Sequence, residues 1–119
     1  MRLIATKRKI PTHSMKIINK YELKIIDGVQ TLDLSSHSGL LKIAEQDGKL
    51  VLWVQECTDC HAEPWTFRIF RTGDKIDVKV DMAFIETVLM SNDLECHVFV
   101  ENDGDIMEIH DIPRSNKDN

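Results

Sequence analysis

The stretch LLKIAEQDGKLVLWVQE, residues 40–56, consists of two strand-like runs on either side of Asp47-Gly48. Asp-Gly between two such runs is the strongest short signal for a β-hairpin, because both turn residues tolerate a positive φ. The second run contains Leu50–Val54, where apolar residues follow one another without alternation. Such an unbroken apolar run is typical of a strand that is buried on both faces. The sequence therefore predicts a hairpin whose second strand is central in its sheet.

The rest of the chain repeats this strand rhythm. Residues 20–25, KYELKI, and residues 29–34, VQTLDL, alternate apolar and polar side chains around Asp27-Gly28, which predicts another hairpin. Further strands are expected in WTFRIFR, FIETVLM, ECHVFVE and DIMEIHDI, the last at residues 105–112. Seven or eight short strands separated by turns predict an all-β fold, an antiparallel sandwich or roll built from hairpins.

The periodic pattern also predicts the domain organisation. A chain of 119 residues fits one domain, and we expect residues 15–112 to form a single β domain. Residues 1–14 carry a cluster of basic side chains without periodicity and are expected to be a flexible arm. Residues 113–119 have nothing to bury and are expected to be a disordered tail. Met15, where the pattern begins, is a candidate natural start in place of Met1.

Composition narrows the classes of partner. The net charge is −5, and an acidic body argues against a nucleic-acid groove, which needs a basic surface. No apolar run approaches the ~20 residues that a membrane-spanning helix needs. The N-terminal segment also lacks the apolar core of a secretory signal. We therefore expect a protein of the cytoplasm that has no membrane partner.

One segment has the residue types of a chemical site, Cys57-Thr58-Asp59-Cys60-His61. Two cysteines at this spacing followed by histidine match covalent haem attachment, but neither an export signal nor a helical haem pocket is predicted. Cys57, Cys60 and His61 are also candidate zinc ligands, with a fourth donor unassigned, because zinc prefers thiolate and imidazole. In the cytoplasm a metal site is more plausible than a disulfide, but the second Cys-x-x-Cys that would make zinc a strong prediction is absent. We therefore favour the alternative of a polar loop with free thiols. We therefore expect no cofactor, and a zinc ion is the alternative to that expectation.

The order of MKIINKYELKI, LLKIAEQDGKLVLWV, EPWTFRIFRTGD and FIETVLMSNDLECHVFVE resembles a family of small uncharacterised β-rich proteins encoded by bacteriophages and prophages. The resemblance covers about residues 15–101, and its most recognisable pieces are Asp47–Trp53 and Phe67–Gly73. The resemblance implies a compact β domain located in the host cytoplasm. No activity is known for this family, so the resemblance assigns no functional residues to this chain. The chain departs from the family at Asp74, where members often have histidine, and at Cys57–His61, where members usually lack cysteines.

No motif of a catalytic or phosphate-binding site is present, so we do not expect an enzyme. The leading hypothesis is a phage-type module that binds a protein, such as a host factor during infection. Exposed strand edges of a small β domain can pair with such a partner or with a second copy. The candidate contacts are Trp65 at a strand entrance, the predicted edge WTFRIF at residues 65–70, and Ile109 in the strand at residues 105–112. An accessory structural role in the virus particle is an open alternative.

A further hypothesis is a sponge-like protein that sequesters a small nucleotide signal. Arg68 and Arg71 would then contact the phosphates, because the guanidinium group binds phosphate through paired hydrogen bonds. The alternative role of both arginines is solubility at a strand edge. Trp53, inside the run Leu50–Val54, is expected in the core.

Overall fold

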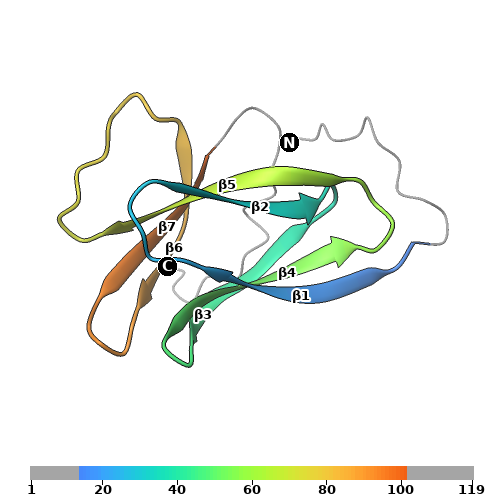
Figure 1. The fold of residues 1–119 in the computed structure, drawn as a ribbon, viewed down its shortest axis with the longest axis horizontal. Coiled ribbons are helices and arrows are strands. Elements are labelled where there is room, and N and C mark those ends of the chain that lie inside the picture. The colour runs from blue at the N-terminus through green and yellow to red at the C-terminus, as the bar shows by residue number, and fades with distance from the viewer. Residues whose placement is uncertain (1–13, 102–119) are drawn as a thin grey trace, which may run out of the picture.

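The computed structural model describes residues 14–101, and this range forms antiparallel strands and no helix. The strands are β1 (Lys16–Leu23), β2 (Val29–Ser35), β3 (Gly39–Gln46), β4 (Lys49–Cys57), β5 (Ala62–Arg71), β6 (Met82–Leu89) and β7 (Glu95–Glu101). They build two sheets in the orders β1-β4-β3 and β2-β5-β7-β6, which pack as two layers (Figure 1). The predicted all-β fold is confirmed. Within the described range there is no helix that could span a membrane.

The core lies between the two sheets and follows the two-residue period of the strands. Leu23 and Leu52 point inward from the first sheet, and Leu34, Phe67 and Val98 point inward from the second. All of these side chains are almost completely buried. Full burial of one such side chain contributes roughly 1.5–3 kcal/mol, so the alternating pattern stabilises both sheets through one shared interior.

The hairpin at Asp47-Gly48 is confirmed, with positive φ at both residues and Gln46 opposite Lys49. β4 is the central strand of its sheet, as the apolar run predicted. The expectation for Trp53 is wrong. Its ring is half-buried on the outer face, with Lys42 Nζ 5.6 Å from the ring centre. Among residues 14–101, one face of this sheet packs against the other layer, so alternate residues of even its central strand face outward.

The second predicted hairpin, around Asp27-Gly28, is wrong. β1 pairs with β4 and β2 pairs with β5, so the chain crosses between the sheets here instead of folding back beside itself. The Gln30 side chain stabilises the connection between the two sheets. It accepts a hydrogen bond from the Lys24 amide (2.8 Å) and donates one to the Lys24 carbonyl (2.7 Å). Turn residues predict that a chain reverses direction, but they do not determine which strands pair afterwards.

In the part of the chain that the structure describes, four strands form the sheet edges, namely β1, β3, β2 and β6. β5 lies between β2 and β7, so the prediction that WTFRIF forms an edge is wrong. FIETVLM is a strand, as predicted, and it falls in β6. The edge strands β3 and β6 each contain a bulge, between Leu40 and Lys42 and between Phe84 and Glu86. The basic arm before residue 14, the predicted strand at 105–112 with Ile109, and the tail lie outside the described residues.

Candidate functional site

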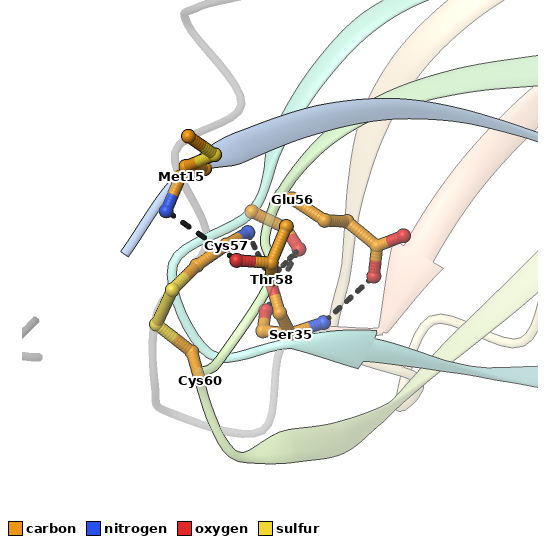
Figure 2. The surroundings of a disulfide bond; sticks show 7 residues. Met15, Ser35, Glu56, Cys57, Thr58 and Cys60 are labelled. Atoms are coloured by element: carbon orange, nitrogen blue, oxygen red, sulfur yellow. Dashed lines mark hydrogen bonds between the residues drawn. A yellow bond between two sulfur atoms is a disulfide. The ribbon is translucent and has the colours of Figure 1, made fainter. Parts of the chain in front are cut away.

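The predicted Cys57–His61 segment forms the connection from β4 to β5, at one end of the sandwich (Figure 2). Cys57 and Cys60 are joined by a disulfide bond, with their Cα atoms 5.3 Å apart. The expectation of free thiols is therefore wrong for this structure. The reason is geometric, because the tight turn that leads from β4 of one sheet to β5 of the other brings residues i and i+3 within the range that a disulfide can bridge.

The disulfide bears directly on the zinc hypothesis. Zinc binds cysteine as thiolate, and neither sulfur is a thiolate while the two are bonded to each other. His61 is exposed, and its Nε2 lies 4.0 Å from Glu63 Oε2. In the part of the chain that the structure describes, no cluster of three His, Cys, Asp or Glu residues could hold a metal ion. A zinc site at Cys57, Cys60 and His61 would require the reduced chain and stays a prediction.

Beside the disulfide lies a buried carboxylate, Glu56, that was not among the residues predicted from the sequence. Glu56 is only 6% exposed. Its carboxylate accepts hydrogen bonds from Asn19 Nδ2 (2.6 Å), the Tyr21 hydroxyl (2.5 Å) and the Ser35 amide (2.9 Å). Asn19 and Tyr21 belong to β1 of the same sheet, whereas Ser35 ends β2 of the other sheet. Glu56 therefore clamps the two layers together at this end.

The protonation states of this cluster fit a structural clamp. Burial alone would raise the pKa of Glu56, but the three hydrogen bonds outweigh burial and lower the pKa below its usual value. Burial, together with the hydrogen bond to Glu56 and the negative charge of Glu56, raises the pKa of Tyr21 to about 12. At neutral pH a charged carboxylate thus accepts from a protonated phenol, as a hydrogen-bonded clamp requires.

Further hydrogen bonds tie the disulfide turn to the neighbouring strands. Ser35 Oγ accepts from the Cys57 amide at 3.0 Å. The Thr58 amide donates to the Met15 carbonyl at 2.9 Å, and the Met15 amide donates back to Thr58 Oγ1 at 3.3 Å (Figure 2). The Ser36 amide donates to the His61 carbonyl at 2.7 Å. The turn is therefore a junction between the beginning of β1, the end of β2 and both strands that it connects.

The arginines proposed as phosphate contacts are both paired with carboxylates. Arg68 Nε lies 2.7 Å from Glu101 Oε2. The guanidinium of Arg71 lies 3.0 Å from Asp27 Oδ1 and 3.6 Å from Asp74 Oδ2. An open pocket lies at this end of β5 and is lined by Arg68 but not by Arg71. Arg68 and Arg71 are three residues apart on β5, so strand alternation directs their side chains to opposite faces of the sheet, and their role toward a nucleotide stays a prediction.

Trp65, proposed as a partner anchor, is half-buried and packs against the core. It lies on the inward face of β5 with Phe67 and Ile69, as the alternation predicted. Only the part of Trp65 that remains exposed is available to a partner. Its role in a partner interface also stays a prediction.

The outer face of the sheet β1-β4-β3 is basic. Strand register places on it Lys16, Ile18, Lys20, Lys42, Lys49 and Trp53, a set that we call the lysine face. All four lysines are exposed, and Ile18 is 61% exposed. The only acidic residue at the outward positions of these three strands is Glu22. Positive charge is thus concentrated on one face of a chain whose net charge is −5.

One family model matches this sequence, that of a domain of unknown function called DUF7352, over residues 15–107. The searches of curated proteins and of solved structures found no match. The family description names neither an activity nor a source. The bacteriophage origin implied by the sequence resemblance therefore stays a prediction.

Proposed function

We propose that this chain, which belongs to the DUF7352 family, is a non-catalytic module that binds an acidic protein segment at the lysine face and the adjoining edge of β1. The observation that carries the proposal is the separation of charge, with four exposed lysines on one face of an acidic chain. The phage-type character implied by the sequence resemblance makes a protein of the host the proposed source of that segment.

The charge of the lysine face favours an acidic partner. Oppositely charged surfaces accelerate association and select between partners more than they raise affinity itself. The interaction is screened over about 8 Å at physiological ionic strength, so the partner's carboxylates must come close to the sheet. Trp53 and Ile18 add apolar area between the lysines, which gives a bound chain something to pack against.

The edge of β1 supplies a way to hold an extended chain. β1 is eight residues long and pairs with β4 without a bulge, unlike the edge strands β3 and β6. No strand within residues 14–101 pairs with its other side. Ile17 is 47% exposed and Met15 is 71% exposed along the same edge. A strand edge without a bulge can accept an added strand, whose main chain then extends the sheet. Lys16 and Lys20 on this edge favour an added strand that carries acidic side chains.

The same residues disfavour two other occupants. If two copies paired through β1, Lys16 and Lys20 of one copy would meet the lysines of the other, which is unfavourable. Single-stranded nucleic acid is held by stacking bases on exposed aromatic rings. The lysine face offers only Trp53, and the ammonium group of Lys42 lies over that ring.

The proposal is tested by nuclear magnetic resonance with two matched peptides of about ten residues, the length of a long strand, one alternating valine with glutamate and the other valine with lysine. The glutamate peptide should shift amide signals of β1 and β4, and the lysine peptide should not. A double variant, Lys16→Glu with Lys20→Glu, should lose the effect. The control, Lys75→Glu with Lys79→Glu, makes the same charge change at exposed positions of the β5–β6 loop and should retain it.

Equal shifts from both peptides, or shifts confined to the sheet β2-β5-β7-β6, would contradict the proposal. If a single-stranded oligonucleotide shifts the same amide signals more strongly than the glutamate peptide, the partner is nucleic acid and the proposal of a protein partner is wrong. Once binding is established, capture from host extract with the wild-type chain and with the Lys16→Glu, Lys20→Glu variant identifies proteins that require the lysine face.

A further inference from the structure

We infer that the Cys57–Cys60 pair is a thiol–disulfide exchange site that small cellular thiols attack at the sulfur of Cys60. The inference is independent of the lysine face and assigns chemistry to the one sequence motif that the proposed function does not use. It rests on the unequal burial of Cys57 and Cys60 and on the backbone hydrogen bonds that hold the turn in place.

The two cysteines differ in access. Cys57 is the last residue of β4 and is 6% exposed, whereas Cys60 is half-buried in a turn whose other members, Thr58 and Asp59, are exposed. Exchange begins when a thiolate approaches a disulfide sulfur, so access decides which sulfur is attacked. Cys60 is therefore the attacked sulfur and Cys57 the leaving one.

The fold around the pair does not depend on the bond between the sulfurs. The Cys57 amide is held by Ser35 Oγ, and the residue on the far side of Cys60, His61, is held through its carbonyl by the Ser36 amide. Neither hydrogen bond uses a sulfur atom, so breaking the disulfide removes no partner from either one. The disulfide closes a loop of only four residues, a length at which cross-linking constrains the unfolded chain least. Both redox states thus fit one backbone, as a reversible site requires.

The exchange balances with glutathione as the thiol. One glutathione thiolate bonds to Cys60 Sγ, and the Cys57–Cys60 bond breaks, leaving Cys57 as a thiolate that takes up a proton. A second glutathione attacks the mixed disulfide and releases oxidised glutathione and the Cys60 thiol. Two electrons pass from two glutathione molecules to the protein, and the two protons end on Cys57 and Cys60.

The first experiment treats the oxidised, folded chain with reduced glutathione, quenches the reaction with acid and maps the modified peptides by mass spectrometry. Glutathione should be found on Cys60. Glutathione found mainly on Cys57, or no reaction under native conditions, would overturn the inference. Cys96 is completely buried and serves as the internal reference, because it reacts only when the chain unfolds. Modification of Cys96 at the same rate as Cys60 would mean that exchange requires unfolding, which also overturns the inference.

A second experiment isolates each thiol and does not depend on disulfide stability. The Cys57→Ser variant leaves the thiol of Cys60, and the Cys60→Ser variant leaves that of Cys57. With an aromatic disulfide reagent, Cys60 should react at least about tenfold faster than Cys57, because rate follows access and thiolate fraction. Equal rates in two folded variants would contradict attack at Cys60.

Discussion

Replacing Glu56 by alanine should remove a large part of the stability of this domain. The substitution leaves three hydrogen-bond donors without their acceptor, on Asn19, Tyr21 and Ser35. The Ser35 amide is buried, and an orphaned buried donor costs about 1–3 kcal/mol. Asn19 and Tyr21 are only partly buried, so water replaces some of what they lose. We expect a loss of about 3–4 kcal/mol, against a total of about 5–15 kcal/mol for an ordinary domain.

Urea unfolding at neutral pH, followed by circular dichroism, measures this loss directly. The transition midpoint should fall while the slope stays unchanged, because the amount of surface exposed on unfolding is nearly the same. Glu56→Gln is the matched control for shape. It keeps one carbonyl oxygen as acceptor and should lose only about 1–2 kcal/mol. A loss below about 0.5 kcal/mol for Glu56→Ala, the range of ordinary surface substitutions, would refute the clamp.

The clamp also has a pH signature. The pKa of Glu56 is lowered in the folded chain from a reference value of 4.5, so its stabilising effect is complete above that value. The effect is lost as pH falls through the lower folded pKa. The difference in unfolding free energy between wild type and Glu56→Gln should therefore be constant from neutral pH down to about 5 and shrink below that. A difference that stays constant to strongly acidic pH would contradict a charged carboxylate at this position.

Three other predictions concern single positions. Tyr21 is the only tyrosine of the chain, so near-ultraviolet absorbance should show its ionisation near pH 12, with stability lost as pH rises from 10 through 12. A midpoint near 10 in the folded chain would argue against its bond to Glu56. Phe67→Ala should cost about 3–5 kcal/mol in urea unfolding, because the ring fills the core between the sheets. Gly48→Ala should cost about 1–2 kcal/mol, because the residue has a φ of 79° and an added Cβ would meet no neighbour, so the loss comes from the backbone alone. An unchanged midpoint would count against that conformation.

The sequence allowed the strands to be predicted but not all of their pairings. The alternation that placed Phe67 and Leu34 inward is a local property, and the structure confirms it. Asp47-Gly48 and Asp27-Gly28 carry the same turn signature, yet only the first joins paired strands. Whether the strand after a turn pairs with the strand before it depends on competing partners elsewhere in the chain. A single turn motif contains no information about those competitors.

In the candidate site, too, the sequence predicted local features but not the contacts between distant segments. The spacing of Cys57 and Cys60 matched a metal or haem motif and favoured a loop with free thiols, but it could not determine whether the sulfurs would be bonded to each other, free or metal-bound. Glu56 was overlooked because a charged residue at a strand end is usually solvated. One signal was present, since Glu56 has the same parity as Leu52 and Val54 and therefore points into the core. Its donors come from distant segments, so the sequence does not identify them.

The crossing of the chain at Asp27-Gly28 has a consequence for how the domain assembles. β1 is made before β4, yet β4 is its pairing partner among the described strands, and Asn19 reaches Glu56 across 37 positions of the sequence. Closing so long a loop is slow compared with forming the hairpins β3–β4 and β6–β7, which need only a local turn. During synthesis on the ribosome, the N-terminal strand must therefore wait, unpaired, until the β3–β4 hairpin has emerged and offers its free side as a template.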